Sequence, residues 1–209
     1  MRRSARARLM RIPSSPLARW GGVAACLGGI SYGAYGYLSD NPDMPRLLIA
    51  AVVPLLKSAT PALFLGGFVG LHAWLGSRFG GGGGTLERAG VGLGLLGGVV
   101  GLLGGVVDEE HGTGLWASLP HHLGGGRTLL YTGLTVVGVA TLLGKEVPRR
   151  RLLGALVLGS GALGWVSLLT DPDFFSGVPG SMGSLHVAFA ALFCLSCVAW
   201  GGVLFSEAS

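Results

Sequence analysis

Long uncharged apolar stretches alternate with short polar segments along this chain of 209 residues. A helix rises about 1.5 Å per residue, so about 20 apolar residues cross a hydrocarbon core of about 30 Å. The pattern therefore predicts an all-α fold, a polytopic membrane helix bundle of about six transmembrane helices. Five of the predicted spans are uncharged runs of sufficient length, at residues 20–38, 89–107, 128–144, 152–170 and 185–205.

The remaining span comes from residues 47–77, a region that is longer than one crossing requires. It contains Lys57 together with Pro54 and Pro61. We expect the span to cover about 58–77, with 46–57 as a kinked or interfacial lead-in that lets the Lys57 amine reach the headgroups. The alternative is one tilted helix kinked at the prolines, which leaves the number of crossings unchanged.

The charges predict the orientation of this bundle. With six spans and a cytoplasmic N-terminus, 12 of the 15 Lys and Arg residues fall in cytoplasmic segments, and only Arg46 and Arg127 fall in outer loops. The positive-inside rule therefore predicts that both termini are cytoplasmic, N-in and C-in. Residues 1–19 would form a basic cytoplasmic arm, 20–205 the transmembrane domain and 206–209 a cytoplasmic tail. The composition of the arm also resembles that of an organellar transit peptide, which is the alternative.

Composition supports a membrane protein and argues against a soluble domain. Charged residues make up 12% of the chain, whereas soluble domains carry roughly 25%. The net charge of +5 follows from the predicted topology, so we expect membrane lipid as a partner and no nucleic acid. Arginine outnumbers lysine 13 to 2, which is typical of a GC-rich bacterial genome and favours a bacterial plasma membrane.

Glycine is the second unusual feature, with 40 residues in the chain. On a helical wheel, the glycines of the third span gather within an arc of about 120°, and the aliphatic residues fill the rest. Small residues on one face let helices in lipid approach closely. We expect this face to pack at the bundle centre or in an interface with a second copy or another membrane protein. The glycines concerned are Gly90, Gly94, Gly97, Gly98, Gly101, Gly104 and Gly105.

Potential metal ligands gather on the predicted outer face. Imidazole and carboxylate groups suit divalent metals such as Zn or Mn, so a divalent metal is possible there, although no cofactor is predicted outright. The spacing matches no established metal motif, and the alternative is a solvated acidic loop with ordinary surface histidines. The candidate ligands are His186, Asp108, Glu109, His111, His121 and His122.

No catalytic residue emerges from the remaining reactive side chains. Cys194 and Cys197 have the spacing of a redox pair but fall near the middle of the last span, where thiolate formation is disfavoured. His72 and His186 fall near opposite membrane faces and cannot share a haem. No Asp or Glu falls inside any predicted span, which argues against an ion-coupled carrier.

These patterns favour a non-enzymatic integral membrane protein that acts through glycine-mediated helix packing with itself or a membrane partner. Two alternatives use the outer-face His and carboxylate cluster. One is a small transporter or channel for an ion or metal, and the other is a metal-dependent membrane enzyme.

Overall fold

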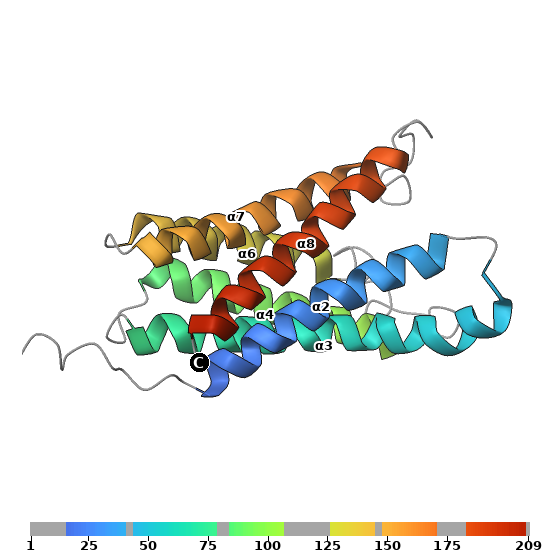
Figure 1. The fold of residues 1–209 in the computed structure, drawn as a ribbon, viewed down its shortest axis with the longest axis horizontal. Helices are drawn as coiled ribbons and strands as arrows, with labels where there is room; N and C mark the ends of the chain where they lie inside the picture. Colours follow the sequence, from blue (N-terminus) through green and yellow to red (C-terminus); the bar gives the residue numbers. More distant parts are fainter. Residues whose placement is uncertain are drawn as a thin grey trace, which may run out of the picture.

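A computed structural model describes residues 16–40, 44–78, 84–106, 126–144, 148–170 and 183–207. These residues form six helices and no strand, which confirms the predicted all-α bundle. The helices are α2 (Pro16–Asp40), α3 (Arg46–Arg78), α4 (Thr85–Val106), α6 (Arg127–Leu143), α7 (Pro148–Leu169) and α8 (Gly183–Glu207) (Figure 1).

Four of the six helices are long and apolar enough to cross a membrane. α6 is apolar but shorter, with 17 residues, and α2 has 25 residues but is not among the four. The four candidate spans are Ile49–Gly76 in α3, Thr85–Leu103 in α4, Arg150–Leu169 in α7 and Leu185–Ser206 in α8.

α3 is a single helix of 33 residues that passes through both Pro54 and Pro61. The structure thus has the continuous helix, rather than a separate lead-in followed by a helix at 58–77. Each proline removes one backbone N–H donor, and membrane helices tolerate this loss because neighbouring helices and side chains can satisfy the freed carbonyl group.

The six helices form a closed ring in the order α2, α3, α4, α6, α7 and α8, and α8 packs back against α2. Successive helices run in opposite directions, so α2 begins and α8 ends at the same end of the bundle (Figure 1). We call this the basic end, because Arg19, Arg88, Arg150 and Arg151 lie in the helix turns there. In the orientation predicted from charge, the basic end faces the cytoplasm.

Glycine contacts bring the backbones of neighbouring helices together. A Cβ atom on Gly21 of α2 would collide with the Cα of Gly70 in α3, and the reverse also holds. On the other side of α2, a Cβ on Gly22 would lie 2.6 Å from the carbonyl oxygen of Gly201 in α8. Such close approach is how helices gain dispersion energy in lipid, where apolar burial itself contributes little.

Aromatic side chains fill the interior of the ring. α2 and α6 are not neighbours, yet the hydroxyl groups of Tyr32 and Tyr131 are 3.1 Å apart. The ring of Phe193 from α8 lies edge-on to both, with centroid distances of 5.3 Å to Tyr32 and 5.2 Å to Tyr131. Phe64 of α3 approaches Phe193 at 5.9 Å. Side chains from four helices therefore meet across the ring at this level and leave its interior filled.

Candidate functional site

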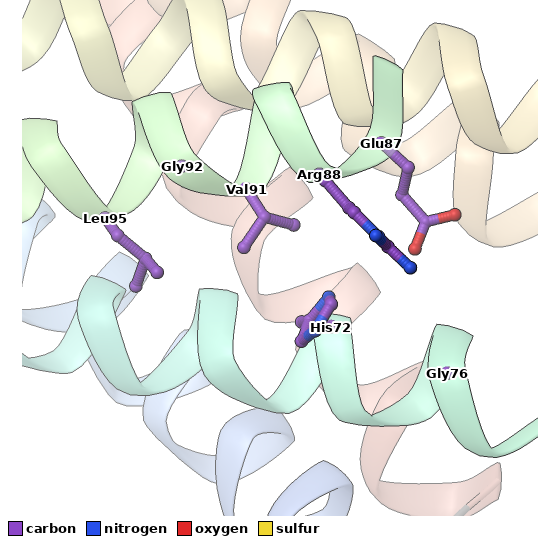
Figure 2. A pocket seen from close by; sticks show the side chains of 7 residues that line it. All are labelled: His72, Gly76, Glu87, Arg88, Val91, Gly92 and Leu95. Atoms are coloured by element: carbon purple, nitrogen blue, oxygen red, sulfur yellow. The ribbon is translucent and has the colours of Figure 1, made fainter. Parts of the chain in front are cut away.

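An open groove of about 410 Å³ lies between α3 and α4 near the basic end. Figure 2 shows Glu87 and Arg88 extending from α4 towards α3, where His72 lies. The groove is lined by His72, Gly76, Glu87, Arg88, Val91, Gly92 and Leu95.

Helical spacing explains why these residues share one surface. Glu87, Val91 and Leu95 are four residues apart along α4, and so lie on one face of the helix. Going inward from the basic end, the groove wall changes from charged to apolar over about 12 Å. The groove stays open at Gly76 and Gly92, where an added Cβ would meet nothing within 4 Å.

Glu87 is the unusual residue of this groove. It lies in the first turn of α4, and only 3% of its surface is exposed. No residue in the described part of the chain donates a hydrogen bond to its buried oxygen Oε1. Buried polar atoms are nearly always hydrogen-bonded, and an unsatisfied carboxylate oxygen is costly.

Burial is the dominant effect on Glu87 and disfavours its charged form. The guanidinium groups of Arg150 and Arg88 act electrostatically in the opposite direction and offset part of this cost. Arg150 belongs to α7, and its Nε donates a hydrogen bond of 3.1 Å to the carbonyl oxygen of Thr141 in α6. The carboxylate therefore lies between the open groove and the cationic start of α7.

Glu87 is the residue that the sequence analysis missed. The predicted span began at residue 89, and the acid was counted with the cytoplasmic loop. Because α4 begins at Thr85, Glu87 is buried within the candidate span Thr85–Leu103, so the expectation that no Asp or Glu falls inside a span is wrong. An acid in the turn just before an apolar run is a helix-start signal that could have placed it.

On the predicted outer side, His186 lies in the first turn of α8. Its Nδ1 is 2.8 Å from the carbonyl oxygen of Ser167 in α7 and 3.4 Å from the hydroxyl oxygen of the same residue. A carbonyl oxygen only accepts hydrogen bonds, so Nδ1 carries a proton and donates it to Ser167, and Nε2 is the ring nitrogen that does not take part in this contact. A hydrogen bond of this kind orients metal-binding histidines.

The other candidate metal ligands, Asp108, Glu109, His111, His121 and His122, lie outside the described residues. Within the helices that the structure describes, no three His, Cys, Asp or Glu side chains are close enough to share a metal ion. The outer-face metal site therefore stays a prediction.

The predicted packing glycines of α4 lie against helices of the same chain. An added Cβ would meet α6 from Gly90 and Gly97, and would meet Phe68 and Leu65 of α3 from Gly94 and Gly98. The backbone nitrogen of Gly101 borders Gly126, directly before α6. Gly104 and Gly105 lie in the last turn of α4.

The three cysteines are free thiols on the two helices that pack together, α2 and α8. Cys26 donates a hydrogen bond of 3.4 Å from its Sγ to the carbonyl oxygen of Val198. Cys197 is fully buried, and its Cβ borders the position where Gly29 has no side chain. These contacts make the cysteines small packing residues between α2 and α8.

Neither a known protein family, nor a curated protein, nor a solved structure matches this chain. Among the described residues of this chain, those of the groove at Glu87 have the most distinctive chemistry.

Proposed function

We propose that this protein is a non-enzymatic protein of the bacterial plasma membrane, with both termini in the cytoplasm, that binds a small amphipathic ligand in the groove between α3 and α4. The excess of Lys and Arg in the predicted cytoplasmic segments supports this orientation. The groove would then open at the cytoplasmic membrane interface, with a charged end at headgroup level and an apolar end facing the acyl chains.

The observation that carries this proposal is the buried carboxylate of Glu87 with its unpartnered oxygen beside an open groove. An acid in the first turn of a helix gains about 0.3–1 kcal/mol from the helix dipole. Removing a charge from water costs several kcal/mol, which exceeds that gain. This cost supports a function for Glu87, because an ionisable residue inside a membrane helix is a candidate for a functional site.

Ligand retention tests this function. Wild-type protein, Glu87→Gln and Gly92→Leu are purified in the same detergent, and the bound small molecules are extracted and compared by mass spectrometry. Glu87→Gln removes the charge at constant size, whereas Gly92→Leu fills the groove. We expect a stoichiometric ligand of the wild type to fall at least fivefold in both variants.

The matched control is Gly159→Leu in α7, because an added Cβ there also meets nothing within 4 Å. It makes the same substitution on an open helix surface away from the groove and should keep the ligand. Identical profiles in all four proteins would rule out a binding function for the groove.

A second candidate function is association with another copy of the chain or with a membrane partner. Gly90, Gly94, Gly97 and Gly98 of α4 are already covered by α3 and α6, so we look for the association surface elsewhere. α8 offers one, since exposed residues follow the alternating spacing of four and three that is typical of helix pairs. They are Ala188, Leu192, Leu195, Ala199 and Gly202.

An outer-face ion or metal site remains a separate proposal, as part of a transporter or channel or of a metal-dependent enzyme. The specific observation in its favour is the orientation of the His186 ring, whose Nδ1 donates a hydrogen bond to the carbonyl oxygen of Ser167.

A further inference from the structure

The position of the groove restricts what can enter it. α3 and α4 are neighbours in the ring, and exposed aliphatic residues of α4, Leu96, Val99 and Leu103, continue beyond Leu95 towards the far end of the helix. In a bilayer, this surface faces acyl chains, while Glu87 and Arg88 lie near the headgroups. A molecule that occupies the whole groove therefore needs a polar end joined to a long apolar part, as in a phospholipid.

The charges of the groove restrict the polar end of the ligand. Glu87 brings a negative charge, and Arg88 beside it brings a positive one, with the His72 imidazole on the opposite helix (Figure 2). A headgroup with a cation next to a phosphate matches this pair. Arginine and phosphate form strong charge-assisted hydrogen bonds.

The carboxylate restricts the cation further. Oε1 of Glu87 lacks a hydrogen-bond donor among the described residues, and a cation that carries N–H groups would complete its hydrogen bonding. A primary ammonium offers three donors. A trimethylammonium group offers none, and a glycerol headgroup leaves the phosphate charge facing Glu87 uncompensated.

The size of the groove agrees with such a ligand. Its volume of about 410 Å³ falls within the range of about 300–1,000 Å³ that is typical of small-molecule sites. Gly76 and Gly92 leave room on both helices, and Val91 and Leu95 provide an apolar wall for the first part of an acyl chain.

We infer that the groove between α3 and α4 is a binding site for phosphatidylethanolamine, with the ammonium at Glu87, the phosphate at Arg88 and His72, and an acyl chain along Val91 and Leu95. This inference rests on the proposed function and specifies its ligand. The recognition depends on two features of the headgroup, namely the N–H donors and the phosphate beside them.

A methylation series tests the inference directly. The full-length protein is reconstituted into nanodiscs that contain phosphatidylethanolamine, its N-monomethyl or N,N-dimethyl derivative, phosphatidylcholine or phosphatidylglycerol. Native mass spectrometry of the released protein then measures the retained lipid. We expect retention to fall stepwise with methylation and to be at least tenfold lower for phosphatidylcholine and phosphatidylglycerol.

Variants assign the retained lipid to the groove. Glu87→Gln should remove the preference for the primary amine, and Gly92→Leu should reduce retention of every lipid, whereas Gly159→Leu should behave as the wild type. Glu87→Gln preserves side-chain volume and Gly92→Leu enters open space, and thermal unfolding of both variants checks that the fold is retained. Soluble phosphoethanolamine serves as a further arm and should not displace the lipid, because it lacks the acyl chain.

The outcomes separate the inference from the function on which it rests. Equal retention of phosphatidylethanolamine and phosphatidylcholine, or displacement by soluble phosphoethanolamine, would overturn the lipid assignment. A different ligand whose binding depends on Glu87 would also overturn it, while leaving the groove's binding function intact. Absence of any Glu87-dependent ligand would overturn both.

Discussion

Gly97 of α4 lies so close to Leu130 of α6 that a Cβ atom on Gly97 would be 2.6 Å from the Leu130 backbone nitrogen. Leu130 cannot move away without shifting α6, since the clash is with backbone rather than with a flexible side chain. Overpacking a core costs about 1–3 kcal/mol, and a clash with backbone belongs at the upper end of this range.

Gly97→Leu should therefore destabilise the bundle by about 3 kcal/mol, measured by reversible denaturation in mixed detergent micelles. Gly92→Leu is the matched control on the same helix, because an added Cβ there meets nothing within 4 Å. Equal stability of the two variants would show that α4 does not pack on α6 through this face.

The second prediction separates a binding role for Glu87 from a structural one. If the acid serves mainly to bind a ligand, Glu87→Gln in ligand-free detergent should unfold at the same temperature as the wild type or higher, because a costly buried charge is removed. If it holds Arg150 in place, removing its charge should cost about 3 kcal/mol or more, as when one partner of a buried ion pair is lost.

Thermal unfolding of delipidated protein makes this comparison, with Glu87→Asp as a variant that keeps the charge on a shorter side chain. A large loss of stability in Glu87→Gln, restored in Glu87→Asp, would assign the carboxylate to the fold and count against the binding proposal.

The third prediction concerns the outer-face metal alternative. If the cluster binds a divalent metal, the purified protein should contain about one equivalent of the metal. This content should fall at least tenfold in His186→Ala and in His111→Ala, because such a site has few ligands and each loss weakens binding strongly. Elemental analysis after dialysis against a metal-buffered solution measures it. Ser206→Ala, at the opposite end of α8, is the control. A metal-free wild type would remove both metal-based alternatives.

The fourth prediction concerns self-association through α8. Gly202→Leu places a bulky side chain in the row of exposed small residues, and should weaken dimers at least tenfold if α8 pairs with its counterpart in a second copy. Energy transfer between labelled chains in vesicles measures the association. Gly159→Leu in α7 should leave it unchanged, and a dimer that tolerates Gly202→Leu must use another surface.

The apolar runs identify helices reliably, because in lipid a segment must satisfy its backbone hydrogen bonds internally and only one regular structure does so without neighbouring strands. The same reasoning locates the glycine face of α4, since helical periodicity alone brings Gly90, Gly94 and Gly97 to one side. The local sequence pattern was sufficient to predict the helices and the glycine face of α4.

The groove at Glu87 could not be predicted in this way. Whether Glu87 is buried depends on where α4 begins and on how α3 and α7 pack around its first turn, both of which are tertiary properties. Helix ends are the least certain part of any sequence-based assignment. The contact between Tyr32 and Tyr131 was likewise invisible, because it joins two helices that are neither consecutive nor adjacent in the ring.

The aromatic cluster across the ring has a consequence for any channel or transporter role. Tyr32, Tyr131 and Phe193 meet across the ring at one level, so an ion moving along the axis would require these three side chains to separate. A path that leaves them in contact would have to run along the outer flank of the bundle.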